Sequence, residues 1–319
     1  MVNTYSVDSE TRGGVEVYTL RQSADVWAEV APALGNNCFA FHAGQPVLEP
    51  VTFEEFAARP TSYGIPILFP FPNRIRDGVF VFNGQRYAVN PNRHGFVRDK
   101  SWRVTGTGAS EQEGAWITSS LDAADYADQI LHQYPFPFRI EVTYRLKDGA
   151  LAMSTTVQNT GENEMPCGFG IHPYFRRPER GTLRAPAAKR WELEDSLPTG
   201  TIVDVAGNYD LRQPKNIDEL HLDDIFTDLQ ADSDGAMRCV LDDQTNNIQT
   251  VVEFHKEEFP HLVLYTPPAP RRAVCIEPYT CPTDAFNLRD QGIESSSVIL
   301  LRPDGMNFGF GVRFYTRGY

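Results

Sequence analysis

The sequence predicts an all-β protein, built as a large antiparallel β-sandwich with a few short helices. Three observations indicate this fold. Short runs of alternating apolar and polar residues recur along the 319-residue chain, punctuated by 24 glycines and 23 prolines. Helical periodicity is confined to two short segments. Apolar residues make up 41% of the chain, which is enough for a large core. No internal repeat or long linker divides the sequence, so we expect one domain over residues 1–319.

Two hairpins are indicated by their turn residues. Residues 79–82 and 85–89 alternate on either side of Asn83-Gly84. This dipeptide supplies the two positive-φ positions of a type I′ turn. Residues 139–146 and 151–157 alternate in the same way around Asp148-Gly149.

The remaining elements rest on weaker patterns. Residues 297–301 lead through Pro303-Asp304-Gly305 into an alternating run, 307–315, which predicts a third hairpin. Residues 53–58 and 123–133 have the spacing of helices of two or three turns.

Charge and composition exclude several classes of function. The chain has 42 acidic and 29 basic residues, a formal net charge of −13, which argues against a nucleic-acid partner. The N-terminus has neither a basic start nor an apolar run, and no stretch approaches 18 consecutive apolar residues. We therefore expect a cytoplasmic protein without a membrane segment. Its five scattered cysteines match no common metal spacing, so we expect reduced thiols and no metal site.

Ionisable side chains next to turn residues mark the candidate site. Glu277 follows an apolar run, 273–276, and precedes a proline, so we expect its carboxylate to emerge at the end of a buried strand. Partial desolvation there would raise its pKa and make it a better base near neutral pH. The alternative is a surface glutamate that pairs with Arg271 or Arg272.

His172 lies between two glycines, Gly168 and Gly170, and Pro173. An exposed imidazole on such a turn would keep a pKa near its ordinary value and exchange protons at neutral pH. The alternative is a histidine that only fills the rim of the core. His94 and Arg74 stand beside turn residues as well, with ordinary loop contacts as their alternative. One carboxylate, two histidines and one arginine together fit general acid–base work on a neutral polyhydroxylated substrate.

The order of these segments resembles the aldose 1-epimerase (galactose mutarotase-like) family. The resemblance covers roughly residues 60–315. The segments that carry it are "PNRI", "FNGQRY", "HGFVRDKSW", "YPFPFRIEVTYRL", "LAMSTTVQNTG", "MPCGFGIHPYF", "LDDIF" and "AVCIEPYTCPTDAFN".

The resemblance implies a β-supersandwich and cofactor-independent interconversion of the α and β anomers of an aldohexose. It implies that Glu277 is the catalytic base toward the anomeric hydroxyl and that His172 is the acid toward the ring oxygen. The positions that would hold the sugar's hydroxyl groups are Asn73, Arg74, His94 and Asp223, and the spacing to Phe226 favours Asp223 over the adjacent Asp224.

One departure from the family pattern leaves the substrate open. Arg176 and Arg177 follow the Tyr174-Phe175 pair, where the family often has a small polar residue. Two guanidiniums beside the acid would bind an anionic group, which makes hexose 6-phosphate an alternative substrate. In the other interpretation both arginines face solvent or pair with acidic residues. A catalytically silent carbohydrate-binding or regulatory module is the main alternative from another class, and a polysaccharide lyase ranks last because the acidic chain would repel a polyanion.

Overall fold

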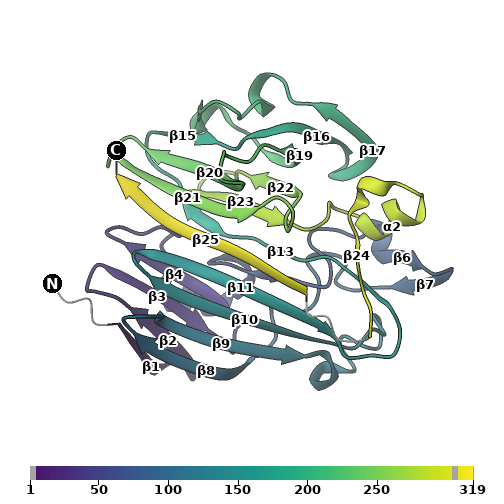
Figure 1. Ribbon diagram of the computed structural model, residues 1–319, viewed down its shortest axis with the longest axis horizontal. Helices are drawn as coiled ribbons and strands as arrows, with labels where there is room; N and C mark the ends of the chain where they lie inside the picture. Colours follow the sequence, from purple (N-terminus) through teal and green to yellow (C-terminus); the bar gives the residue numbers. More distant parts are fainter. Residues whose placement is uncertain (1–4, 304–307, 319) are drawn as a thin grey trace.

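The larger of the two main sheets has nine antiparallel strands. The computed structural model describes residues 5–303 and 308–318. The strand order is β18-β15-β20-β21-β25-β11-β10-β9-β8, and β25 runs between β11 and β21 (Figure 1). The strands are β8 (Arg103–Ser110), β9 (Gly114–Asp122), β10 (Phe138–Lys147), β11 (Ala150–Asn159), β15 (Gly181–Arg184), β18 (Lys215–Asn216), β20 (Ala236–Asp243), β21 (Ile248–His255) and β25 (Phe308–Gly318).

A second, eight-stranded sheet packs on the first. Its order is β17-β16-β19-β22-β23-β13-β5, and β14 also pairs with β23. Aromatic side chains join the two layers: Phe175 lies 5.8 Å from Phe314, and Phe169 stacks on Phe310 at 4.8 Å between ring centroids. The strands are β5 (Ile67–Leu68), β13 (Gly170–Ile171), β14 (Tyr174–Arg176), β16 (Ala187–Glu194), β17 (Leu197–Asp204), β19 (Asp223–Leu229), β22 (His261–Tyr265) and β23 (Ala273–Tyr279).

Smaller elements complete the structure. A four-stranded sheet, β1-β2-β3-β4, lies against β8 and β9, and two strand pairs, β6-β7 and β12-β24, stand apart from the main sheets. The small strands are β1 (Ser6–Arg12), β2 (Val15–Arg21), β3 (Val26–Ala31), β4 (Asn37–Ala43), β6 (Val79–Phe82), β7 (Gln85–Ala88), β12 (Met165–Cys167) and β24 (Ile299–Leu301). The helices are α1 (Phe53–Ala58), α2 (Ala285–Asp290) and the 3₁₀ turns η1 (Pro60–Ser62), η2 (Arg76–Gly78), η3 (Ala123–Tyr126), η4 (Gly207–Tyr209), η5 (Ile217–Glu219) and η6 (Glu294–Ser296).

The predicted all-β class and two of the three hairpins are confirmed. Strands β6 and β7 are joined through Asn83 and Gly84, whose φ angles are 51° and 75°. Strands β10 and β11 are joined through Asp148 and Gly149, at 49° and 74°. Both turns therefore have the two left-handed residues that a tight hairpin requires. The short helix over 53–58 is also confirmed, and Thr52 caps it by accepting a hydrogen bond from the Glu55 amide.

Two predicted elements are wrong. Residues 297–301 and 307–315 do not pair with each other, because β24 pairs with β12 while β25 pairs with β11 and β21. The intervening residues 304–307 lie outside the described part of the chain. The helix over 123–133 is only the 3₁₀ turn η3 followed by irregular turns, and α2 was not predicted.

Strand β23 separates the main core from the candidate site. Val274 and Ile276 belong to the principal apolar cluster, which also takes side chains from β21 and β25. Because side chains alternate along a strand, Cys275, Glu277 and Tyr279 lie on the opposite face of the sheet. That face carries the cavity described next.

Candidate active site

The centre of the site is a break in the pairing beside β23. Gly170 of β13 pairs with Tyr279, and Tyr174 of β14 pairs with Cys275. The same register places His172, between β13 and β14, opposite Glu277. Pro173 and Pro278 have no N–H group to donate at this point of the ladder. The pairing is therefore interrupted where the two ionisable side chains face each other.

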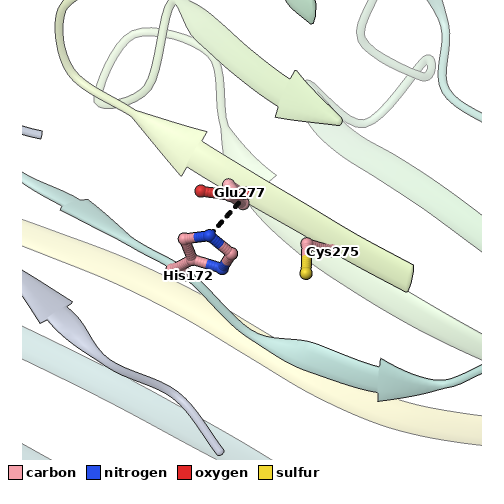
Figure 2. Close-up of side chains that lie close together, drawn as sticks. All are labelled: His172, Cys275 and Glu277. Carbon is pink, nitrogen blue, oxygen red and sulfur yellow. Dashed lines mark ion pairs between the residues drawn. The ribbon is translucent and has the colours of Figure 1, made fainter. Parts of the chain in front are cut away.

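His172 and Glu277 are in direct contact. The Nε2 atom of His172 lies 3.4 Å from Oε1 of Glu277 (Figure 2). About one hundred residues separate them in the sequence, but β23 and the β13–β14 connection bring them to the same face of one sheet. The other carboxylate oxygen, Oε2, accepts a hydrogen bond of 2.6 Å from the hydroxyl of Tyr279. Both oxygens of Glu277 thus have a defined neighbour.

The position of Glu277 differs from the expected strand end. The strand continues through Pro278 to Tyr279, so Glu277 lies within β23, opposite Val263 of β22. The residue is only 1% exposed. Burial raises its pKa well above the ordinary value, while the Tyr279 hydrogen bond and the charge of Arg74 act in the opposite direction. The pKa of Glu277 is raised, as predicted, but its side chain is more fully buried than the predicted strand end implied.

His172 is also less exposed than expected. Its side chain keeps 12% of its accessible surface, and its ring stacks on Tyr174 at 4.5 Å between centroids. Burial lowers the pKa of His172, and nearby arginines add to this effect. The expectation of a pKa near the ordinary value is therefore wrong. Gly170 is required for packing, because a Cβ atom there would lie 2.5 Å from Cδ1 of Tyr279.

The opposite wall is formed by the segment after β5 and by residues 93–94. The His94 amide donates to the Asn73 carbonyl at 2.6 Å, and Arg74 forms an isolated bridge with Arg93. Asn73 and His94 have positive φ angles of 54° and 65°, so this wall depends on two tight left-handed turns. The Arg74 guanidinium donates to Oδ1 of Asn73 at 2.9 Å.

His94 completes this wall beside the catalytic candidates. Its ring lies 5.6 Å from that of His172 in an edge-to-face arrangement. Burial lowers the pKa of His94 well below its ordinary value, and the charges of His172 and the nearby arginines lower it further. The imidazole of His94 is thus kept neutral and suited to hydrogen bonding.

Asp223 closes the cavity from the side of β19. It is the first residue of that strand and pairs with Tyr265 of β22. Asp223 lines the cavity, whereas its neighbour Asp224 is buried and lies 3.6 Å from Arg190. The structure therefore brings Asp223, rather than Asp224, together with the other candidates.

The cavity has a volume of about 200 Å³. Six predicted residues line it together: Asn73, Arg74, His94, His172, Asp223 and Glu277. Five further residues line the cavity and were not predicted as site residues: Arg93, Tyr174, Val263, Tyr265 and Tyr279. Alternation along β22 and β23 was the available signal for Val263, Tyr265 and Tyr279, because these positions share a face with Glu277.

Arg176 and Arg177 lie outside this cavity. The Arg176 guanidinium is 2.6 Å from a carboxylate oxygen of Asp243, and that of Arg177 is 2.7 Å from one of Asp218. Neither arginine lines the cavity of His172 and Glu277. These contacts agree with the interpretation in which both arginines pair with acidic residues, and neither arginine lines the cavity as the alternative anion clamp would require.

One set of side chains has the ligand types of a metal site. His172, Cys275 and Glu277 offer ligand atoms within 4.8 Å of one another (Figure 2). A metal would require the thiolate form of Cys275, yet burial raises the pKa of this thiol well above its ordinary value. Glu277 is also engaged by Tyr279. The donor set therefore fits a proton-transfer pair better than a metal ion.

All five cysteines are free and buried. Within residues 5–303 and 308–318, the helices are too short and too polar to span a bilayer.

Comparison with known proteins identifies the family. The family model for aldose 1-epimerase matches residues 41–305, which is most of the chain. The chain therefore belongs to the aldose 1-epimerase family. It is 25% identical over 240 residues to the uncharacterized protein YihR of Escherichia coli (strain K12), covering 69% of this chain and 71% of YihR.

Solved structures have the same fold. A galactose mutarotase-like protein from Clostridium acetobutylicum superposes with a TM-score of 0.86 at 22% identity, over 99% of both chains. Galactose 1-epimerase from Lactobacillus acidophilus NCFM superposes with a TM-score of 0.78 at 17% identity, again over 99% of both chains. At these identities the likeness concerns the fold, which is the galactose mutarotase-like β-sandwich.

Proposed function

We propose that this protein interconverts the α and β anomers of an aldohexose without a cofactor. The observation that carries the proposal is the 3.4 Å contact between Nε2 of His172 and Oε1 of Glu277 inside a cavity of about 200 Å³. The anomeric oxygen and the ring oxygen of a pyranose are both bonded to C1. The acid and the base that exchange protons with these two oxygens must therefore lie close together, as His172 and Glu277 do.

The reaction follows from the two groups. Glu277 removes the proton of the anomeric hydroxyl while His172 delivers a proton to the ring oxygen. The C1–O5 bond breaks and C1 becomes an aldehyde. Rotation about the C1–C2 bond presents the other face of the aldehyde, and the reverse proton transfers close the ring as the other anomer. Each group then returns to its starting state, so no co-reactant is consumed.

The shifted pKa values fit this exchange. Burial disfavours the charged form of both groups, so the pKa of Glu277 is raised and that of His172 is lowered. The pair is then best described as sharing one proton. The active form, a carboxylate beside an imidazolium, has the same number of protons as the neutral pair. Sugar oxygens that accept and release protons stabilise the charged arrangement within the cavity.

The other lining residues hold the sugar. Asn73, Arg74, His94 and Asp223 present amide, guanidinium, imidazole and carboxylate groups around the same cavity. Nδ1 of His94 and Nδ1 of His172 are buried and have no hydrogen-bond partner among the described residues. Buried polar atoms require a partner, and a polyhydroxylated ligand supplies several.

The proposal is tested by dissolving fresh α-glucose or α-galactose and measuring by polarimetry how fast each sugar reaches anomeric equilibrium. We expect the protein to accelerate equilibration of at least one of them. Glu277→Gln and His172→Asn should each lower kcat by about 10²–10⁴-fold, the usual contribution of a positioned acid or base. Binding of sugar without acceleration of any anomer would instead favour a silent binding module. Near-normal activity of either folded variant would refute the role assigned to that residue.

A further inference from the structure

Arg271 contacts the aromatic side chain on which His172 stacks. It lies in the connection between β22 and β23. The Cζ atom of Arg271 is 4.1 Å from the centroid of the Tyr174 ring. Tyr174 in turn stacks on the His172 ring at 4.5 Å between centroids, with the two planes 19° apart. Tyr174 therefore links Arg271 to His172 by contact with both.

The guanidinium of Arg271 is itself firmly held. The carboxylate of Glu49 accepts hydrogen bonds from its Nε and Nη2 atoms, at 2.9 and 2.5 Å. Nη2 also donates to the Ser62 carbonyl, and Cζ lies 4.8 Å from the centroid of the Tyr63 ring. A planar guanidinium that binds a carboxylate through two nitrogens has a defined orientation. The group that contacts Tyr174 is therefore held in one orientation.

The imidazole of His172 lacks the hydrogen bond that usually orients a catalytic histidine. In such histidines the second ring nitrogen commonly bonds a carboxylate or a backbone carbonyl, which fixes the ring. Among the described residues, Nδ1 of His172 is buried and has no hydrogen-bond partner. The 3.4 Å contact of Nε2 with Glu277 is longer than most hydrogen bonds. The orientation of the ring therefore depends on packing, and Tyr174 lies closer to it than the edge-on rings of His94 and Tyr265.

The positive charge of Arg271 also affects the proposed acid. Burial is the main cause of the lowered pKa of His172, and the charge of Arg271 is one of several arginine charges that lower it further. A lower pKa makes the imidazolium a stronger acid toward the ring oxygen. Because the Glu49 carboxylate lies against this guanidinium, its negative charge offsets much of the effect. We therefore expect the packing of Arg271 to contribute more than its charge.

We propose that Arg271 is a positioning residue for the proposed acid and that it acts through Tyr174. By fixing the Tyr174 ring, it keeps the His172 imidazole opposite Glu277, in the orientation that proton transfer to the ring oxygen requires. Arg271 does not line the cavity, so it need not touch the sugar. A displacement of about 1 Å at reacting groups can slow a reaction about 100-fold. This inference rests on the proposed anomer exchange.

Steady-state kinetics of anomer exchange test this role. Arg271→Gln should lower kcat by about 10–100-fold and change KM by less than about 2-fold, because the residue orients the acid without binding the sugar. Arg271→Lys keeps the charge but not the planar fork, so it should recover only part of the loss. Wild-type kcat in Arg271→Gln would contradict the proposal. Full recovery in Arg271→Lys would show that the charge alone matters and would overturn the packing role.

Arg176→Gln is the matched control. The Arg176 guanidinium also pairs with a largely buried carboxylate, that of Asp243, and its side chain is 24% exposed, against 25% for Arg271. It lies two residues after Tyr174 in the same strand, β14. Arg176→Gln therefore removes a comparable ion pair near the same backbone and should keep kcat near that of the wild type. An equally large loss of kcat in this control would refute a specific role for Arg271.

Variants of Tyr174 test the path from Arg271 to His172. If Arg271 acts through the Tyr174 ring, the effects of the two residues cannot be independent. In Tyr174→Phe, which keeps the ring, Arg271→Gln should have its full effect. In Tyr174→Leu, where kcat is already lowered, Arg271→Gln should lower it little further. Losses that simply multiply in the Tyr174→Leu background would overturn the inference.

A measurement without turnover keeps the two proposals separable. The chain has seven histidines, so NMR with ring-labelled histidine can follow His172, assigned with His172→Asn. Stacking on Tyr174 shifts the ring resonances of His172. Arg271→Gln should change this shift, Arg271→Lys should change it less, and Arg176→Gln should leave it unaltered.

The two readouts can fail independently. If no sugar equilibrates faster with the wild type, the proposed reaction fails, while the His172 resonances still report whether Arg271 positions the ring. If anomer exchange is confirmed but the His172 resonances are the same in Arg271→Gln as in the wild type, the positioning role is refuted and the reaction stands.

Discussion

Tyr279 donates its hydroxyl proton to Oε2 of Glu277 over 2.6 Å, and both side chains are buried on the same face of β23. The residues are two positions apart, so strand alternation alone brings them together. This hydrogen bond stabilises the carboxylate form within an environment that otherwise opposes it. Tyr279 is therefore a positioning residue for the proposed base.

Replacement of Tyr279 by phenylalanine should affect the pH dependence as well as the rate. Loss of the hydrogen bond raises the pKa of Glu277 further, so the alkaline limb of the activity profile should move to higher pH. We expect kcat to fall about 10-fold, in line with loss of a hydrogen bond to a charged group. Tyr134→Phe is the control, because it removes a buried hydroxyl that donates to the Pro166 carbonyl and neither residue lines the cavity. An unchanged pH profile in Tyr279→Phe would contradict this role.

Glu277→Gln should lose activity but gain stability. In the folded protein the pKa of Glu277 is raised, so the wild type loses stability as pH rises above the ordinary glutamate range. Glutamine carries no charge and avoids this loss. We expect the variant to be more stable by about 1–2 kcal/mol at pH 8, a gain typical of a relieved functional site. The gain should vanish at a pH below that range, and denaturant titration at both pH values measures the difference.

Activity should follow a bell-shaped pH profile with a broad plateau. The pair must carry one proton, and it gains a second when His172 is protonated while Glu277 is neutral. Since the pKa of His172 is lowered, the acid limb should lie below the ordinary histidine value of about 6.5. Since the pKa of Glu277 is raised, the alkaline limb should lie above the ordinary glutamate value of about 4.3. A single limb centred on an unshifted histidine, in kcat/KM for a neutral sugar, would refute the shared proton.

Gly170→Ala should disturb the site through packing. A methyl group there would lie 2.5 Å from Cδ1 and 2.8 Å from Cε1 of Tyr279, so the ring must move away. We expect a loss of about 1–3 kcal/mol in the free energy of unfolding, as for other overpacked positions. We also expect lower kcat, because the displaced ring carries the hydroxyl that bonds Glu277. Gly84→Ala is a comparison site, since its Cβ would meet nothing within 4 Å, although its positive φ adds some strain. Normal activity of Gly170→Ala would show that the position of the Tyr279 ring is not important for catalysis.

Local patterns were sufficient for elements that depend on neighbouring residues. The β6–β7 and β10–β11 hairpins follow from turn residues with positive φ between alternating strands. The third hairpin was wrong because β25 pairs with β11 and β21, which are distant in sequence, rather than with β24. Turn residues do not determine which distant strand a given strand pairs with.

The candidate site, too, was predictable only as far as adjacent residues determine it. Residue types and neighbouring prolines pointed to Glu277 and His172, but the pairing of β13 and β14 with β23 determines that they meet. Pro278 was taken to end the strand, yet it lies where the adjacent ladder is already interrupted at Pro173. The burial that lowers the pKa of His172 arises because β13 and β14 pair with β23, about one hundred residues further along the chain, so it could not be derived from adjacent residues. The partners of Arg176 and Arg177 are likewise distant in sequence.

The central place of β25 has a consequence for truncated chains. This strand joins β11 to β21 in the nine-stranded sheet, so without it β8 to β11 form one half-sheet, and β15, β18, β20 and β21 form another, each with an open edge. Unpaired edges invite association with other chains. A chain truncated before Phe308 would therefore keep both edges open and should aggregate more readily than the full chain.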